Sequence, residues 1–262
     1  MRVEIDGRAA FAGTGGRPFD PQRPAVLFLH GAGMDHTVWA LQARYFAHHG
    51  RAVLAADLPG HGRSEGPPLR SIEEMAAWAL RLLDAAGAAR AALVGHSMGA
   101  LVALAAVAAA PERAASLALL GVAARLAVHP ELLAAAAAGR HLAPELVASW
   151  GFGRAGHFGG NPAPGLWMMG GALRLLEGAG PGVLGNDLAA CAAYDGALAA
   201  AARVACPTLL LLGADDRMTP PPAARPLAEA MRAARTVVLP GAGHMSMLER
   251  PDAVIDALKD AV

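Results

Sequence analysis

The sequence predicts an α/β fold: a mostly parallel central sheet of about eight strands with helices on both faces. Short apolar runs bounded by turn residues recur along the chain. They are continuous rather than alternating, which is typical of strands buried on both faces of a parallel sheet. Helical patterns lie between them, as expected of βαβ units. The runs occupy residues 25–29, 52–55, 91–94, 116–120, 208–212 and 236–239.

Two local patterns add elements to this sheet. Residues 3–5 and 9–11 flank Asp6-Gly7, a dipeptide favoured in tight hairpins, so the sheet is expected to begin with an antiparallel pair. The clearest helix begins at Ser71, which forms a capping box with Glu74, and its apolar residues recur at helical spacing before Gly87.

An insertion interrupts the alternation after the sixth strand, over residues 122–204. Two Ala-rich stretches, 131–138 and 187–202, predict helices around a Gly-rich middle at 151–182. Such an insertion predicts a helical lid over the carboxyl edge of the sheet. We therefore expect a core domain of residues 1–121 and 205–262, and a lid of residues 122–204.

The charge composition excludes several classes of chemistry. The chain has 22 basic and 22 acidic side chains, a formal net charge of zero, and a single lysine, Lys259. Phosphate-binding loops, pyridoxal enzymes and Ser-Lys hydrolases each need a lysine in their site, which a lysine in such a terminal segment cannot supply. Without a basic run or net positive charge, binding to nucleic acid is not expected.

Two cysteines, Cys191 and Cys206, are too few for a four-cysteine zinc site and are expected to be reduced thiols. Residues 1–24 lack an apolar core of signal-peptide length, and the stretch 91–110 is too polar to span a membrane. We therefore expect a cytoplasmic protein without a membrane partner, metal or cofactor. Homo-oligomer formation is left open.

The candidate nucleophile is Ser97, in the segment Gly95-His96-Ser97-Met98-Gly99 that joins a predicted strand to a helix. A sharp turn of this kind exposes the serine above the sheet, and the flanking glycines avoid a clash. The turn also places the Met98 amide at a helix N-terminus, where it can donate to a developing oxyanion.

A serine hydroxyl becomes a good nucleophile when a base takes its proton, and histidine is the usual base near neutral pH. His244 follows the last predicted strand, in a loop that can reach the edge where the serine lies. Asp215 and Asp216 both follow the preceding strand, and their position alone allows either to orient His244. Asp57 is more simply explained as a residue that bonds its own turn.

Five short motifs follow one another in a fixed order along the chain. They are His30-Gly31-Ala32-Gly33, Asp57-Leu58-Pro59-Gly60-His61-Gly62-Arg63-Ser64, the Ser97 segment, Gly213-Ala214-Asp215-Asp216-Arg217 and Gly243-His244. In order and spacing they resemble the α/β-hydrolase family, specifically its lidded, esterase-like members, over nearly the whole chain. The resemblance implies that Asp216 is the acid, that His244 is the base, and that Ala32 is the second oxyanion donor.

The resemblance implies a serine hydrolase that cleaves a small or medium apolar carboxylic ester or lactone through an acyl-enzyme intermediate. Two alternatives share the fold. One is hydrolysis of a carbon–carbon bond, for which Arg140 or Arg154 would supply a polar lid group but against which His96 weighs, because such enzymes tend to carry Asn there. The other is perhydrolysis of the haloperoxidase kind. A third alternative, from another class, is a non-catalytic protein that binds a ligand in the lidded pocket.

The expected substrate pocket draws on apolar side chains near these motifs and on histidines of the lid. The apolar candidates, each of which could equally belong to the core, are Met34, Trp39, Met98 and Met245. The lid histidines, one of which could touch substrate, are His129, His141 and His157. Five further histidines are expected to be solvated (His48 and His49), to shape loops (His30 and His61) or to pack beside the nucleophile (His96).

Overall fold

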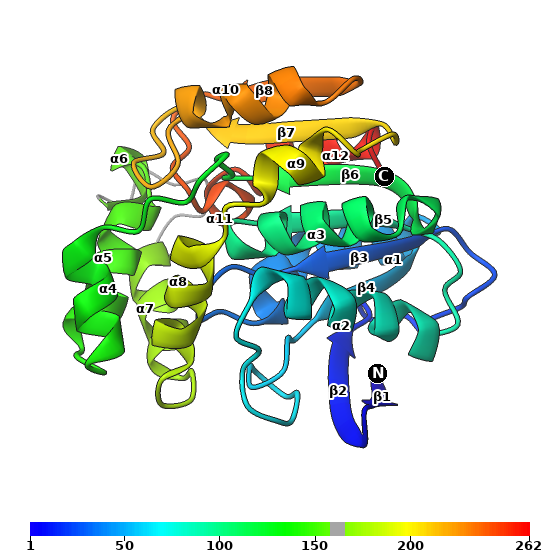
Figure 1. Cartoon of the computed structure of the whole chain (residues 1–262), viewed down its shortest axis with the longest axis horizontal. Coiled ribbons are helices and arrows are strands. Elements are labelled where there is room, and N and C mark those ends of the chain that lie inside the picture. Colours follow the sequence, from blue (N-terminus) through cyan, green and yellow to red (C-terminus); the bar gives the residue numbers. More distant parts are fainter. Residues whose placement is uncertain (158–165) are drawn as a thin grey trace.

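The computed structural model describes residues 1–157 and 166–262 of the chain. Within these residues, eight strands form one sheet in the order β1-β2-β4-β3-β5-β6-β7-β8 (Figure 1). The pairs β1–β2 and β2–β4 are antiparallel and the others are parallel, which confirms the predicted fold class. The strands are β1 (Arg2–Ile5), β2 (Arg8–Gly13), β3 (Ala25–Leu29), β4 (Ala52–Ala56), β5 (Ala91–His96), β6 (Ala114–Leu120), β7 (Thr208–Gly213) and β8 (Ala234–Leu239).

The first hairpin turns at the predicted dipeptide. Asp6 and Gly7 both have positive φ, 53° and 73°, and Ile5 pairs with Arg8. Positive φ at both central residues matches the right-handed twist of the flanking strands, so the turn fixes the antiparallel register that the sequence predicts.

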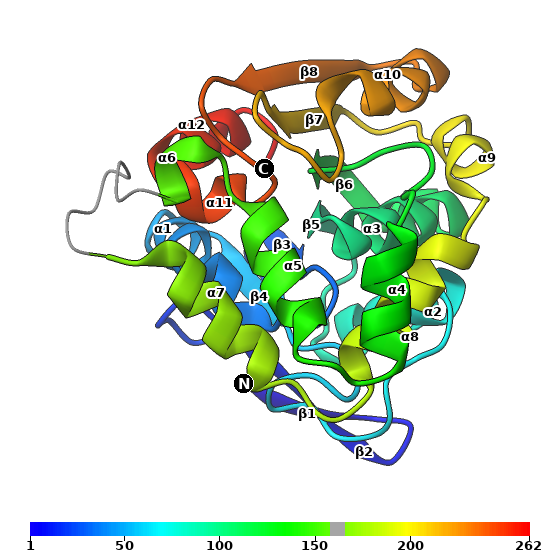
Figure 2. The ribbon, with the colours of Figure 1, turned by 90° about the vertical axis from the view of Figure 1, so that its left-hand side faces the viewer.

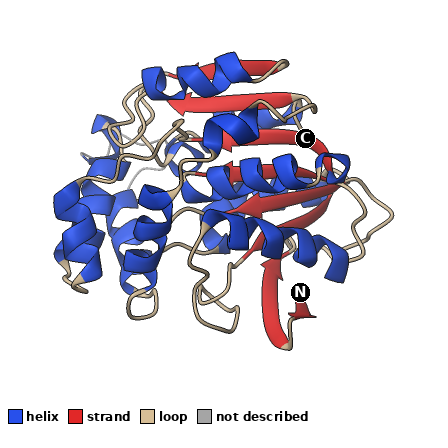
Figure 3. Cartoon of the chain, viewed as in Figure 1, coloured by secondary structure: helices blue, strands red, loops and turns tan. Residues whose placement is uncertain are grey.

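Helices cover both faces of the sheet, as predicted (Figure 3). Along β3, Leu27 and Leu29 pack into the core cluster that includes α2 and α3, while Val26 and Phe28 pack into the cluster that includes α1 and α12. The helices outside the insertion are η1 (His36–Trp39), α1 (Ala40–His48), α2 (Ile72–Ala85), α3 (Met98–Ala109), η2 (Pro111–Arg113), α10 (Pro221–Ala230), α11 (Ser246–Glu249) and α12 (Pro251–Lys259).

The predicted capping box is only half formed. The Ser71 side chain accepts from the Glu74 amide and begins α2, but the Glu74 carboxylate accepts from the Arg70 amide instead of the Ser71 amide. The helix stops before Gly87, whose φ is +74°. One side-chain cap is therefore sufficient to set the start of this helix.

Six helices of the described residues lie in the insertion between β6 and β7, and α4, α5, α7 and α8 stand on the side of the sheet where the parallel strands have their carboxyl ends (Figure 2). The six helices are α4 (Pro130–Ala137), α5 (Leu142–Gly151), α6 (Arg154–His157), α7 (Met168–Glu177), α8 (Val183–Ala193) and α9 (Ala197–Ala201). We call residues 122–204 the lid. Its division from the core as a separate domain stays a prediction, and the middle of its Gly-rich part, 158–165, lies outside the described residues.

The single helix predicted over 187–202 is wrong. The chain leaves helical geometry at Tyr194, where φ is −76° and ψ is 118°, and resumes it after Gly196. The second piece, α9, packs against α3 and α10 instead of covering the strand ends. Among the described residues, none of the helices has the length and apolar character needed to cross a membrane.

Candidate active site

Ser97 lies at the sharp turn between β5 and α3, with φ 53° and ψ −116°. A positive φ is strained for a serine, and here the surrounding backbone imposes it. A Cβ at Gly95 would overlap the Gly99 carbonyl, and a Cβ at Gly99 would overlap the Leu29 carbonyl. Only glycine fits at either position, so the two glycines permit the turn that leaves Ser97 half-buried at the strand edge.

Asp216 and His244 form a buried pair at the carboxyl ends of β7 and β8. His244 Nδ1 donates to Asp216 Oδ2 at 2.8 Å, while Asp215 is exposed. Asp216 Oδ1 also accepts from the Met218 and Thr219 amides at 2.8 Å, and the Thr219 hydroxyl donates to Oδ2 at 2.7 Å. Burial raises the pKa of Asp216, but the His244 ring and these donors outweigh it and hold the pKa well below its ordinary value. Asp216 is therefore a carboxylate near neutral pH.

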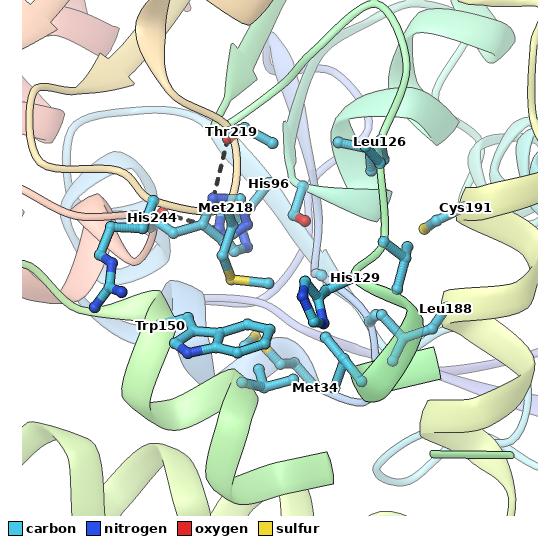
Figure 4. Close-up of a pocket in the computed structure, with 18 of the residues that line it drawn as sticks. Met34, His96, Leu126, His129, Trp150, Leu188, Cys191, Met218, Thr219 and His244 are labelled. Atoms are coloured by element: carbon cyan, nitrogen blue, oxygen red, sulfur yellow. Dashed lines mark hydrogen bonds between the residues drawn. The ribbon is translucent and has the colours of Figure 1, made fainter. Parts of the chain in front are cut away.

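The other ring nitrogen of His244, Nε2, is buried and has no hydrogen-bond partner among the described residues. Both His244 and Ser97 line one cavity, and Figure 4 shows His244 at its wall. No hydrogen bond joins the Ser97 hydroxyl to His244 within the described ranges. The three residues that the sequence predicts as nucleophile, acid and base therefore lie close together. Asp216 is bonded to His244, whereas Ser97 and His244 are not hydrogen-bonded to each other.

His96 packs beside His244, with ring centroids 4.7 Å apart. Its Nε2 donates to the His244 carbonyl at 3.0 Å. Burial, and the neighbouring His244 ring, hold the pKa of His96 well below its ordinary value, so it is a neutral side chain. This contact fixes the backbone of His244 through the residue that precedes Ser97.

The two candidate oxyanion donors come from two different parts of the fold. Ala32 lines the cavity in the loop after β3. Met98 is the first residue of α3, where an amide has no acceptor within the helix, and its side chain is fully buried. Their role as donors stays a prediction.

The cavity at this edge has a volume of about 590 Å³ and mostly apolar walls. Of the four apolar candidates, only Met34 lines it; Trp39, Met98 and Met245 are buried in the core, so for these three the core alternative holds. Other walls come from the lid and from the loop after Asp216. The lining residues are Gly31, Ala32, Met34, His96, Ser97, Leu126, Ala127, Val128, His129, Pro130, Leu132, Val147, Trp150, Leu188, Cys191, Arg217, Met218, Thr219 and His244.

The three lid histidines lie in different surroundings, and one of them lines the cavity. His129 lines the cavity, edge-on to Trp150 at 5.3 Å between ring centroids, and lies across it from Thr219 in Figure 4. His141 is exposed and pairs with Glu145 and Glu177. His157 contacts the Phe152 carbonyl at 3.2 Å.

The two histidines predicted to be solvated, His48 and His49, are exposed. Arg140 and Arg154 are exposed and do not line the cavity, whereas Arg217 does.

Cys191 faces the cavity but is not a competing nucleophile. Burial raises the pKa of its thiol far above neutral pH, so it stays protonated. Cys191 and Cys206 are both free.

Glu249 joins the lid to the loop that carries His244. Its Oε1 accepts from the Gly153 amide and its Oε2 from the Gly243 amide, each at 2.7 Å. Burial has the largest influence on the pKa of the Glu249 carboxyl and raises it. The hydrogen bonds from the two amides lower the pKa and so offset part of this rise. A lone glutamate just after a histidine loop carries no sequence signal for such a contact.

Asp35, His36 and Asp57 bring three possible metal ligands within 4.8 Å of one another. Their polar atoms already bond each other and the backbone: Asp57 accepts from the His36 ring, the His36 amide and the Arg63 amide. Asp57 thus bonds its own turn, as predicted. These hydrogen bonds account for the cluster without an ion.

The fold and the elbow at Ser97 define an α/β hydrolase. Residues 26–257 match the model of the alpha/beta hydrolase family, and the chain belongs to that family.

The most similar solved structures include an enol-lactonase from Burkholderia xenovorans LB400, with a TM-score of 0.87 and 27% identity over 99% of this chain and 98% of that one. A thermophilic esterase has a TM-score of 0.81 and 28% identity over 99% and 95% of the two chains. A curated relative, the dihydrolipoyllysine-residue acetyltransferase component of an acetoin cleaving system from Pseudomonas putida, is 37% identical over 46% of this chain and 32% of its own length. The matched part thus spans about a third of that relative.

Proposed function

We propose that the protein is a serine hydrolase that cleaves a small to medium apolar carboxylic ester or lactone. The observation that carries the proposal is that the half-buried Ser97 shares a cavity with His244. His244 Nδ1 is bonded to the Asp216 carboxylate, and its Nε2 has no hydrogen-bond partner among the described residues. This arrangement suits general-base activation of a hydroxyl.

In the proposed reaction, Ser97 Oγ attacks the carbonyl carbon while His244 Nε2 takes its proton. Asp216 holds the ring orientation and stabilises the imidazolium, and the Ala32 and Met98 amides donate to the oxyanion. The tetrahedral intermediate collapses, and the leaving alkoxide takes the proton from Nε2. A water then loses a proton to Nε2 and attacks the acyl-enzyme, which releases the acid and returns the proton to Ser97.

The substrate class follows from the walls of the cavity. Leu126, Val128, Val147 and Leu188 present apolar surface that excludes water from an acyl chain, and a volume of about 590 Å³ suits a small to medium molecule. The likeness to an enol-lactonase and an esterase supports ester or lactone bonds. The exposed positions of Arg140 and Arg154 give no support to carbon–carbon bond hydrolysis.

A panel of p-nitrophenyl esters and lactones of graded chain length, assayed with the wild-type protein and Ser97→Ala, tests this proposal. We expect turnover of apolar substrates by the wild type and a loss of about 10⁵-fold in the variant. Substitution at Ser97 leaves the core packing intact, so the thermal unfolding temperature should stay within a few degrees. Turnover that survives in Ser97→Ala contradicts the proposal, and tight ligand binding without turnover favours a binding protein.

We further propose that the protein works in the reducing cytoplasm, which the free thiols Cys191 and Cys206 support. Its partner there is a small-molecule substrate, which the volume of the cavity supports.

A further inference from the structure

Asp187 is a lid residue on α8 whose side chain is completely buried against the core. Its Oδ2 accepts from the Gly33 amide and from His61 Nε2, each at 2.8 Å. A buried carboxylate needs such partners, because an unpaired charge in the interior is costly. Through these two bonds the lid reaches the loop after β3 that carries Ala32.

His61 is held from both sides by oxygen atoms. Its Nδ1 lies 3.0 Å from the Pro59 carbonyl and its Nε2 faces the Asp187 carboxylate. A carbonyl and an ionised carboxylate both accept, so with Asp187 ionised both ring nitrogens carry a proton and the ring is an imidazolium. Burial opposes this charge, but the hydrogen bond and charge of Asp187 outweigh it and raise the pKa of His61. Asp187 and His61 therefore form a buried ion pair.

The loop is fixed on the other side by His30. Its Nε2 accepts from the Leu58 amide at 3.1 Å, so its Nδ1 carries the proton and donates to the Gly31 carbonyl at 2.9 Å. The pKa of His30 is lowered to about 4, mainly by burial and then by His61, which keeps this ring neutral. The Met34 amide donates to the same carbonyl at 3.2 Å.

These bonds determine where the Ala32 amide points. The Gly31 carbonyl and the Ala32 N–H belong to one planar trans peptide, so fixing the carbonyl directs the N–H the opposite way. The next amide, that of Gly33, is fixed by Asp187. Gly33 has φ +67°, and the lid side chains Leu184 and Leu176 pack where its Cβ would be. Without Asp187, the Gly33 amide loses this hydrogen bond, and the conformational freedom of glycine lets this end of the loop turn more easily.

We propose that Asp187 is a positioning residue by which the lid orients the Ala32 amide as an oxyanion donor, directly through the Gly33 amide and indirectly through His61. The proposal rests on the proposed hydrolase function. Asp187 touches neither the substrate nor the reacting atoms. Its effect falls on the transition state, because the oxyanion exists there and not in the bound ester.

The test compares Asp187→Ala and Asp187→Asn with Asn186→Ala in hydrolysis of p-nitrophenyl butyrate. Asn186 is the control, because its side chain donates to the Leu69 carbonyl at 2.7 Å and so also joins α8 to the core. It makes a longer contact of 3.3 Å with Asp187 Oδ1, and the bonds of Asp187 Oδ2 to Gly33 and His61 do not involve it. An alkyl trifluoromethyl ketone, which forms a tetrahedral adduct with a serine, reports on the oxyanion site. Butyrate reports on ground-state binding, and thermal unfolding reports on the fold.

Loss of a complete oxyanion donor lowers kcat by about 10²–10³-fold, so a misoriented donor in Asp187→Ala should lower kcat by about 10- to 100-fold. The inhibition constant of the ketone should rise by a similar factor, with KM and butyrate inhibition nearly unchanged. Asp187→Asn keeps the size and an acceptor oxygen but loses the charge, so we expect an intermediate effect. Asn186→Ala should stay within about twofold, because the two hydrogen bonds it removes leave Asp187 Oδ2 on Gly33 and His61.

Equal kcat and ketone inhibition in Asp187→Ala and Asn186→Ala would overturn the inference, as would a kcat loss with unchanged ketone inhibition. If Asp187→Ala does not fold, Asp187→Asn decides by the same ratio of ketone to butyrate inhibition. Ser97→Ala is measured in parallel: turnover that survives there removes the proposed function itself, whereas its loss with an unaffected Asp187→Ala removes only the positioning role.

Discussion

Two buried aspartate–histidine pairs lie in different regions of the molecule and have the same nitrogen-to-oxygen distance, through Nδ1 in His244 and through Nε2 in His61. Asp216 and His244 meet at the carboxyl ends of β7 and β8, and Asp187 and His61 meet between the lid and the core; each pair is joined at 2.8 Å. They differ at the second ring nitrogen. His244 Nε2 has no partner among the described residues, whereas His61 Nδ1 donates to the Pro59 carbonyl.

The state of the second ring nitrogen distinguishes a histidine that can transfer a proton from one that only stabilises the structure. A general base needs a nitrogen that is free to accept a proton and then give it away. His61 has both nitrogens saturated and cannot do this without breaking a buried hydrogen bond. A buried Asp–His contact is therefore no sign of catalysis by itself; the surroundings of the far nitrogen are the informative feature.

The largest expected difference lies between His244→Gln and His61→Gln. Removal of the proposed base should lower kcat for an apolar p-nitrophenyl ester by about 10⁵-fold or more, as loss of a triad histidine does elsewhere. His61→Gln should lower it by only about 10- to 100-fold, because its effect passes through one oxyanion donor. Steady-state kinetics of both variants measure this, and similar losses in the two would abolish the distinction.

The next effect compares the two neighbouring acids. Asp216→Asn should lower kcat by about 10⁴-fold, because an amide in place of the carboxylate disturbs the His244 tautomer and no longer stabilises its charged form. Asp215→Asn is the control, since Asp215 is exposed and the carboxylate bonded to His244 is that of Asp216. Its kcat should stay within about twofold, as for most surface substitutions. A larger loss in Asp215→Asn would show that the acid is assigned to the wrong residue.

The smallest effect is on stability, and it has opposite pH dependence in the two pairs. The pKa of Asp216 lies below its ordinary value of 3.8, so the pair stabilises the fold above that pH and its contribution is lost as the pH falls through the lowered pKa. The pKa of His61 lies above its ordinary value of 6.5, so its contribution is complete below pH 6.5 and is lost as the pH rises through the raised pKa.

Thermal unfolding of the wild type, Asp187→Asn and Asp216→Asn from pH 3 to pH 9.5 measures these contributions. We expect the wild-type advantage over Asp187→Asn to shrink above pH 6.5, and the advantage over Asp216→Asn to shrink only below pH 3.8. A change of 1 kcal/mol shifts the unfolding temperature by about 2–4 °C in a chain of this size. An advantage over Asp187→Asn that grows with rising pH would contradict the charge assigned to His61.

The sequence predicts the fold and the elbow well because their signals are local. Continuous apolar runs identify the parallel strands. The two glycines around Ser97 are needed because a Cβ at either position would overlap backbone atoms. The site edge also follows from topology, because the ends of parallel strands meet at one edge of a sheet. The proximity of Ser97, Asp216 and His244 could therefore be anticipated, while their catalytic roles stay predictions.

The lid and its contacts could not be predicted, because they depend on packing between distant segments. Asp187 contacts Gly33 from 154 positions away. Its only sequence signal is a lone acid at the start of an otherwise apolar stretch. Thr219 follows Asp216 by three residues, and a hydroxyl so close to a candidate acid is a signal that could have been used. The sequence left open whether Trp39 and Met245 line the pocket or the core, because apolar side chains look the same in a core and in a cavity wall.

The most direct test of the central claim is to trap the acyl-accepting residue. The wild-type protein is treated with an alkyl fluorophosphonate, digested, and analysed by mass spectrometry, with Ser97→Ala and His244→Gln alongside. We expect one adduct, on the peptide that carries Ser97, formed rapidly by the wild type, very slowly by His244→Gln and not at all by Ser97→Ala. An adduct on another residue, or continued ester turnover by a protein that carries no adduct at Ser97, would contradict it.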